Sequence, residues 1–230
     1  MYHAVLTENV YELKTKSLES VPSDSALVLS TQQTDRLRAA EVHVIVSAQS
    51  GAGLATTASD NILNPLFTLL GVEPRVHKTT SKTSHSEYLA STVFSRVHVN
   101  IILILGGDTI IYDLLNALPK NNHLTSSHRF TICPIPCGTG NALAMSLKTT
   151  SIPIGISKVF GVSESGTVHN TILPVMKISI REPQQERTIW GAVVCSWGLH
   201  ASLVADSDDP EMRKQHGANR FAVHSPSYSC

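Results

Sequence analysis

Long apolar runs, excess charge and paired cysteines are all scarce in this 230-residue sequence, and each scarcity argues against a class of protein. No stretch reaches the roughly 20 apolar residues that a membrane-spanning helix needs. The 18 basic and 18 acidic residues balance, so the charge predicts no nucleic acid partner. Four cysteines without zinc-type spacing favour reduced thiols. The N-terminus lacks a basic region followed by an apolar run, and we therefore expect a cytoplasmic protein.

Two common phosphate-binding motifs are also missing. Gly51-x-Gly53 is not a Rossmann fingerprint, because Thr56 stands where the third glycine belongs, and there is no Walker A sequence. Taken alone, this small-residue turn is more typical of a plain connection than of a phosphate site.

What the sequence does contain is an alternation of strand, turn and helix patterns, repeated about four times. Because such alternation is typical of a parallel sheet covered by helices, we predict an α/β fold. Pro65 is expected to kink or break its helix, Gly71 to end it, and Ser84 with Glu87 to form a capping box. The predicted strands are Val42–Val46, Val72–His77, Ile101–Leu105 and Phe130–Ile135, and the predicted helices are Ala55–Leu70, Ser84–Phe94, Ile110–Leu118 and Ala142–Leu147.

The strongest candidate site follows the buried strand Ile101–Leu105. Gly106 and Gly107 allow close approach of the backbone to a ligand, and Asp108 places a carboxylate where a helix begins. A second glycine turn, 138–141, follows the next strand. Because the carboxyl ends of parallel strands share one edge of the sheet, we expect the two turns to meet across a crevice. The alternative is that both are simple turns, with Asp108 capping a helix.

Five ordered stretches of the sequence resemble the diacylglycerol kinase catalytic domain family of lipid kinases, most closely the sphingosine and long-chain base kinases. They cover about residues 42 to 221. These stretches are Val44–Ala55, Thr80 with His85, Ile101–Leu118, Pro136–Ala144, and a final set made of Ser196-Trp197-Gly198, Ala205-Asp206, Glu211, Arg213, Arg220 and Phe221.

The resemblance implies an ATP- and Mg²⁺-dependent kinase that phosphorylates a sphingoid base, in transient contact with a membrane surface. It implies a division into an N-terminal extension (1–40), an α/β ATP-binding domain (41–150), a partial β-rich lipid-binding domain (151–221) and a tail (222–230). Asp108 would be the general base and Asp206 would recognise the lipid head group. The nucleotide would contact Gly51, Thr80, Gly106, Gly107, Asp108, Asp113, Gly138, Thr139, Gly140, Asn141, Arg213 and Arg220.

The sequence departs from the family pattern at three neighbouring positions. Thr109 replaces a glycine, Ile110 a threonine and Asp113 a glutamate. The family also continues through further strands to a terminal Asp-Gly-Glu motif, so we expect the β-rich domain to be incomplete and the chain to be C-terminally truncated. These departures leave three alternatives: a catalytically inactive nucleotide- or lipid-binding homologue, a diacylglycerol or ceramide kinase, and, less favoured, a kinase of a soluble substrate such as an NAD kinase.

Overall fold

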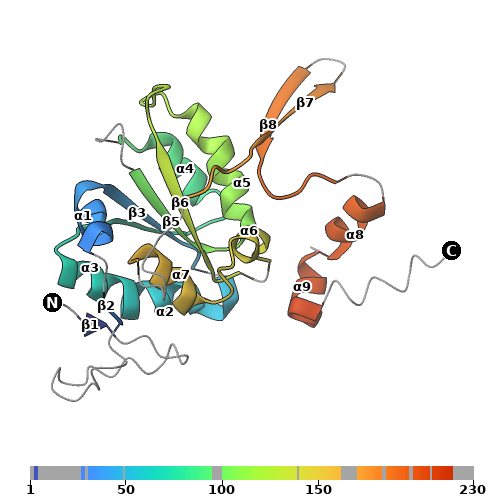
Figure 1. Ribbon diagram of the computed structural model, residues 1–230. Coiled ribbons are helices and arrows are strands. Elements are labelled where there is room, and N and C mark those ends of the chain that lie inside the picture. The colour runs from blue at the N-terminus through green and yellow to red at the C-terminus, as the bar shows by residue number, and fades with distance from the viewer. Residues whose placement is uncertain are drawn as a thin grey trace. The chain divides into compact units, whose positions relative to one another are not determined.

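The main body is a four-stranded, all-parallel sheet in the order β4-β3-β5-β6 (Figure 1). The computed structural model describes residues 3–4, 27–28, 31–48, 50–94, 100–138, 140–161, 170–182, 185–196, 199–207 and 209–219. The parallel α/β fold predicted from the sequence is therefore confirmed. The strands of this sheet are β3 (Glu41–Val46), β4 (Arg75–Lys78), β5 (Asn100–Gly106) and β6 (Phe130–Pro136).

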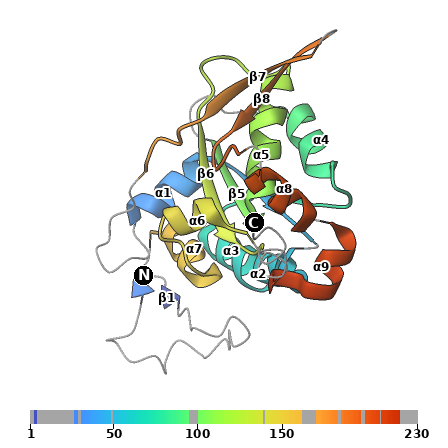
Figure 2. The same cartoon turned by 90° about the vertical axis from the view of Figure 1, so that its right-hand side faces the viewer.

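Helices cover both faces of the sheet (Figure 1, Figure 2). On one face, alternate strand residues such as Val44 and Leu103 pack with buried residues of α1, α2, α3 and α7, which together form the main hydrophobic core. On the other face lie α4 and α5, which contact one another. The helices are α1 (Thr31–Ala39), α2 (Leu54–Ala58), α3 (Asn64–Leu70), α4 (Ser84–Ser91), α5 (Asp108–Ala117), α6 (Ala142–Ser146) and α7 (Ile152–Val159).

The helix predicted after the first strand is present, with a local change of winding ahead of its proline. A π-helical turn, η4 (Ser59–Leu63), joins α2 to α3, and Pro65 lies in the first turn of α3. A proline has no N–H to donate to the preceding turn, so a widened turn at this point disturbs few backbone bonds. Gly71 ends the helix with φ 65°, as the sequence indicated.

The capping box predicted for α4 is wrong. Thr83, not Ser84, is the N-cap residue, and the amide of Glu87 donates to the Thr83 carbonyl. The Ser84 hydroxyl is turned to the preceding loop, where it accepts from the Thr80 amide at 3.0 Å and donates to the Ser81 carbonyl at 3.2 Å. The helix also ends at Ser91, three residues earlier than expected, because the chain is already extended at Thr92.

Two of the helices that pack in the main core were not predicted. Helix α1 lies within the stretch we read as extension and linker, and it buries Leu37 in the main core. Helix α7 follows the last predicted α/β element; Ser151 caps it by accepting from the Ile154 amide, and its apolar residues, including Ile156, enter the same core. The packing of α7 extends the α/β core to about residue 160.

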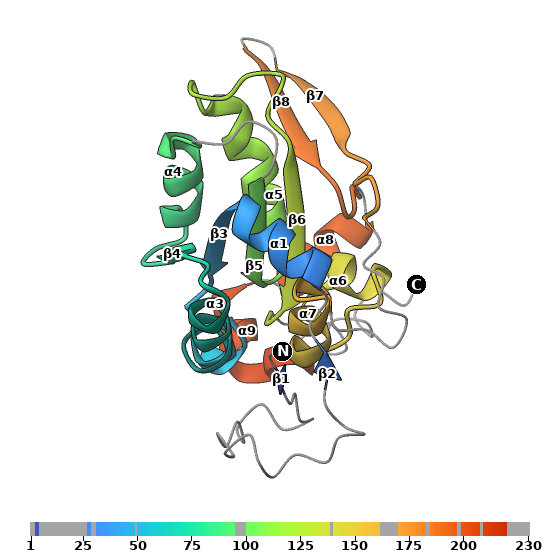
Figure 3. The same ribbon diagram turned by 60° about the vertical axis from the view of Figure 1, so that its left-hand side comes forward.

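After residue 170 the structure describes a hairpin of two antiparallel strands, β7 (Met176–Glu182) and β8 (Gln185–Gly191) (Figure 3). The polar residues 181–182 and 185–187 lie within these strands. A boundary at 192/193 divides the chain into two compact units. The second unit contains α8 (Leu199–Ser207), α9 (Pro210–His216) and η6 (Gly217–Asn219), whereas the first also includes the short pair β1 (His3–Ala4) and β2 (Leu27–Val28). The domain boundaries proposed from the sequence stay predictions.

Candidate functional site

The loops that leave the parallel strands are tied together at the carboxyl edge of the sheet. The Ser47 amide donates to the Leu105 carbonyl at 2.9 Å, which joins the turn after β3 to the end of β5. The Ala48 amide donates to the Thr79 hydroxyl at 3.0 Å, which joins the same turn to the loop after β4. Sequence reasoning missed Ser47 and Thr79. Their signal was position, since each is the first residue after its strand.

The two predicted glycine turns lie against one another. The Cys137 amide donates to the Gly106 carbonyl at 3.2 Å, and the Asp108 amide donates to the Gly140 carbonyl at 3.3 Å. A Cβ atom built on Gly138 would lie 2.7 Å from the Gly107 Cα atom, a distance that side chains do not tolerate. Glycine is therefore required where the two backbones cross. The predicted meeting of the turns is confirmed.

Asp108 joins the first turn to the helix that follows the second. Its Oδ2 atom accepts from the Ala142 amide at 2.6 Å, and Oδ1 accepts from the Leu143 amide at 3.1 Å. The carboxylate thus satisfies two of the amides that a helix N-terminus leaves unbonded. The alternative, that Asp108 caps the helix directly after its turn, is wrong: Gly107 is the N-cap residue of α5, Asp108 is the first residue of α5, and its carboxylate caps α6.

Asn141 closes the second turn from within. Its Oδ1 atom accepts from the Gly138 amide at 3.1 Å, and its Nδ2 atom donates to the Gly138 carbonyl. The side chain predicted to contact the nucleotide therefore holds the shape of the turn. Cys137 precedes the turn, and burial raises the pKa of its thiol to about 12, so this thiol stays protonated at neutral pH and is a poor nucleophile.

Asp113, which was predicted to contact the nucleotide, pairs with His85. The distance from His85 Nε2 to Asp113 Oδ2 is 2.7 Å, and the pair joins the first turn of α4 to α5. Since a carboxylate only accepts, Nε2 carries the hydrogen. The other ring nitrogen, Nδ1, is buried, and within the described residues it has no hydrogen-bond partner. The side chain of this aspartate, shorter than the family's glutamate, reaches the histidine.

Thr109, the departure from the motif glycine, introduces no backbone strain. It lies in the first turn of α5 and is exposed. Among the described residues, Lys148 is the non-glycine residue with a positive φ, so Thr109 adopts an ordinary helical conformation. A β-branched side chain at this position needs no special backbone angle.

The remaining predicted residues lie in neighbouring loops, in the second compact unit or outside the described residues. Gly51 lies in η3 (Ser50–Gly53), after β3, and Thr80 is exposed in the loop after β4. Asp206 is an exposed residue of α8 and Arg213 lies in α9; both belong to the second compact unit. Thr139 and Arg220 lie outside the described residues.

No group of three or more histidine, cysteine, aspartate or glutamate side chains within the described ranges could hold a metal ion. In general, Mg²⁺ bound with a nucleotide is held by one or two carboxylates and by substrate phosphates.

The fold and the turns define an open α/β protein whose ligand edge is formed by the carboxyl ends of its parallel strands. The family profile described as the diacylglycerol kinase catalytic domain matches residues 41–171, more than half of the chain. The chain belongs to the diacylglycerol kinase catalytic domain family.

Similar proteins include sphingoid long-chain bases kinase 1 of Arabidopsis thaliana, 33% identical over 111 residues, which are 48% of this chain and 14% of that protein. Sphingosine kinase 1 of Rattus norvegicus is 24% identical over 194 residues, covering 81% of this chain and 48% of that protein. The chain spans about half or less of the length of these relatives. A solved putative diacylglycerol kinase from Bacillus anthracis str. Sterne is 19% identical, with a TM-score of 0.43, over 60% of this chain and 43% of that one.

Proposed function

We propose that this chain is an ATP-dependent lipid kinase that transfers the γ-phosphate to a hydroxyl of a sphingoid long-chain base. The observation that carries the proposal is the position of Asp108, a carboxylate held where two touching glycine turns meet at the ligand edge of the sheet. The choice of a sphingoid base is supported by the names of two relatives, a sphingoid long-chain base kinase and a sphingosine kinase.

Asp108 can act on an alcohol while it caps α6. A carboxylate has about four lone-pair sites, and the amides of Ala142 and Leu143 use two of them. The two bonds fix the orientation of the carboxylate, and the remaining lone pairs can accept the hydrogen of a substrate hydroxyl. As the phosphoryl group is transferred, Asp108 would take that proton as general base.

The turns suit the phosphates of a nucleotide. The glycines at 107 and 138 let the two backbones touch, and a Cβ atom on Gly140 would meet nothing within 4 Å, so the turn faces open space at Gly140. The exposed hydroxyl of Thr80 lies in a neighbouring loop. Bound with ATP, Mg²⁺ would neutralise charge on the phosphate oxygens, and Asp108, which follows Gly106 and Gly107, would be the carboxylate of the turns that contributes a ligand.

A lipid acceptor would require contact with a membrane surface, which we propose to be transient. In the part of the chain that the structure describes, no helix has both the length and the apolar character to cross a bilayer. Delivery of the acceptor would therefore depend on surface contact by the described region.

The test combines ATP binding with phosphate transfer. Wild-type protein should be stabilised thermally by Mg²⁺–ATP and should label sphinganine with radioactive phosphate, in preference to ceramide and diacylglycerol. Asp108→Asn should lower transfer about 100-fold or more, because general-base catalysis contributes factors of that size. Absence of any labelled lipid above the Asp108→Asn background would reject the proposal.

Asp108 also has a structural role, so the variant needs a matched control. Asparagine would lose one of the two bonds to the α6 amides, at a cost of about 1 to 2 kcal/mol. Ser151→Ala removes the cap of α7 and should cost a similar amount without touching the turns. If both variants lose stability but only Asp108→Asn loses transfer, the loss of activity is chemical.

The second candidate function is a nucleotide-binding homologue without transfer activity. The pairing of Asp113 with His85 favours it, because this charged residue of the motif is occupied within the protein. Thermal stabilisation by ATP without any labelled product would support this candidate. Labelled ceramide or diacylglycerol in place of sphinganine would keep the kinase and change its substrate.

A further inference from the structure

Asn116, on α5, forms two hydrogen bonds with the backbone of one residue of the β7–β8 hairpin. Its Nδ2 atom donates to the Trp190 carbonyl at 2.8 Å, and its Oδ1 atom accepts from the Trp190 amide at 2.9 Å. The two residues are 74 positions apart in the sequence. A residue of an adjacent antiparallel strand would form the same pair of bonds, one donated and one accepted, with its backbone N–H and C=O. Here a side-chain amide forms them.

The orientation of this amide is fixed by its partners. The second hydrogen of Nδ2 goes to the Tyr112 carbonyl of α5, also at 2.8 Å. Turning the amide over would place its oxygen against two carbonyl oxygens, so a single orientation satisfies all three groups. Aspartate has the same shape but cannot donate, and alanine can do neither. The contact therefore specifically requires the asparagine amide.

Trp190 lies at the point of β8 where such a bond can form. It is the partner of Lys177 in the register of the hairpin, and the Lys177 ammonium lies 5.9 Å from the centre of the indole ring. Because both backbone groups of Trp190 bind Asn116, they point away from β7, toward the free edge of the hairpin. Figure 2 and Figure 3 show β8 beside α5, as the contacts between these elements require.

The helix that Asn116 belongs to begins at Asp108. Eight residues separate the two positions, or about 12 Å along the axis at 1.5 Å per residue. A helix transmits orientation along this distance without a joint, so the hairpin is fixed to the element that carries the candidate general base.

We propose that Asn116 is a positioning residue that holds the β7–β8 hairpin at a set place relative to Asp108. Its consequence for catalysis rests on the proposed function: if the stretch 151–221 binds the lipid, as the resemblance implies, detachment of the hairpin weakens the use of lipid and not of ATP. The anchoring itself does not depend on any activity.

The test compares Asn116→Ala and Asn116→Asp with Asn122→Ala, an exposed asparagine of the following loop, in the full chain. Hydrogen exchange at the Trp190 amide should become about tenfold faster in both Asn116 variants, as expected for loss of one or two hydrogen bonds, and should be unchanged in Asn122→Ala. Unchanged exchange at Trp190 in Asn116→Ala would overturn the proposal.

Kinetics separates positioning from general destabilisation. The KM for sphinganine should rise about fivefold or more in both Asn116 variants, while the KM for ATP and the thermal shift with Mg²⁺–ATP stay at wild-type values. An equal loss toward ATP and sphinganine would overturn the positioning role. If wild-type protein transfers no phosphate, the proposed function and the acceptor-side consequence both fail, and exchange at Trp190 still decides the anchor.

Discussion

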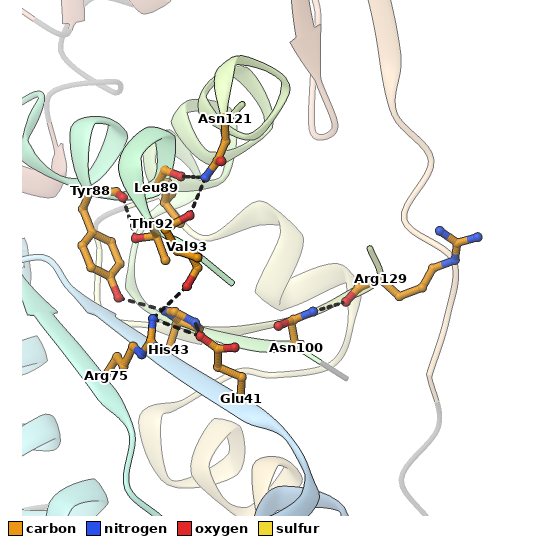
Figure 4. Close-up of polar contacts among 10 residues, drawn as sticks. All are labelled: Glu41, His43, Arg75, Tyr88, Leu89, Thr92, Val93, Asn100, Asn121 and Arg129. Carbon is orange, nitrogen blue, oxygen red and sulfur yellow. Dashed lines mark hydrogen bonds and ion pairs between the residues drawn. The ribbon is translucent and has the colours of Figure 1, made fainter. Parts of the chain in front are cut away.

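The polar side chains at the two edges of the parallel sheet differ in how completely they are bonded within the protein. At the amino edge, Glu41, His43, Arg75 and Tyr88 bind one another (Figure 4). The Glu41 carboxylate forms an ion pair with Arg75 Nη1 at 3.1 Å and accepts from His43 Nε2, also at 3.1 Å, and His43 Nδ1 accepts from the Tyr88 hydroxyl at 2.8 Å. At the carboxyl edge, the bonds of the Asp108 carboxylate within the described residues go to two backbone amides, and they leave it with lone pairs.

The difference separates a structural network from a site. His43 is fully buried on the inner strand β3, and each of its ring nitrogens has a partner. The charged side chains next to it are bonded to other groups of the protein, as buried polar groups normally are. The carboxyl edge instead places glycines and an incompletely bonded carboxylate beside open space. Perturbing the first edge should change stability, and perturbing the second should change ligand binding.

Gly138→Ala should have the largest effect. The new Cβ atom would lie 2.7 Å from the Gly107 Cα atom. Because that Cα atom belongs to the backbone and cannot rotate away as a side chain does, the two turns must separate. We expect a loss of about 3 kcal/mol of unfolding free energy and of the thermal shift with Mg²⁺–ATP. Gly140→Ala is the control, because its Cβ atom meets nothing within 4 Å and its effect on folding should be below about 0.5 kcal/mol. Equal effects of the two variants would mean that the turns do not touch.

Glu41→Gln should break the amino edge. It removes the charge that Arg75 and His43 share, and the Glu41 side chain is only 7% exposed. We expect a loss of about 2 kcal/mol of unfolding free energy in a denaturant titration, below the range for fully buried pairs because the Arg75 side chain is 50% exposed. The KM for ATP should not change. A change in that KM beyond twofold would show that the two edges are coupled.

How much of this contrast the sequence predicts depends on the kind of signal. The glycine turns and Asp108 were predicted because glycine pairs after an aliphatic strand are local patterns. The pairing of His85 with Asp113 was not predicted, since the two residues lie 28 positions apart. Each of them is also a residue type that is common on a solvent-exposed helix surface. The amino-edge network was invisible for the same reason: a histidine within Val42–Val46 says nothing of what lies across from it.

The helices missed or mis-capped by sequence reasoning have a related cause. Helix α1 carries few apolar residues and is held by tertiary contacts. One of them is a hydrogen bond from the side-chain nitrogen Nε2 of Gln33 to the Val159 carbonyl at 3.1 Å. Ser84 has the residue type and spacing of an N-cap, but a competing loop amide at Thr80 uses its hydroxyl. Local propensity identifies the elements, whereas long-range partners decide their ends.

The stability of the amino edge should depend on pH. Burial lowers the pKa of His43 below its usual 6.5, and this outweighs the opposing effect of Glu41, while Arg75 lowers it further. Because the unfolded chain then takes up the proton first, stability is complete above about pH 6.5 and is lost as the pH falls toward the folded-state value. The slope should approach about 1.4 kcal/mol per pH unit for one histidine.

Denaturant titrations of wild type and His43→Gln between pH 7.5 and 5 measure this slope. The variant should be less stable at pH 7.5 and should lose less stability on acidification. His77→Gln is the matched control: the pKa of His77 is also lowered, first by burial and then by His85, but its ring is only partly buried. An unchanged slope in His43→Gln would show that His43 does not contribute to the acid sensitivity.

The smallest expected effect concerns the pair of His85 and Asp113, which shares features of both edges. It is internally bonded, as at the amino edge, but it links α4 to the helix that begins with Asp108. In a double-mutant cycle of His85→Gln and Asp113→Asn, we expect a coupling free energy of about 1 kcal/mol, because the side chains are in contact and only partly exposed. If the pair is structural, the thermal shift with Mg²⁺–ATP will be the same in Asp113→Asn as in His85→Gln. If Asp113 contacts the nucleotide, as the sequence resemblance implied, Asp113→Asn alone will lose the shift, and the comparison will assign Asp113 to the carboxyl edge.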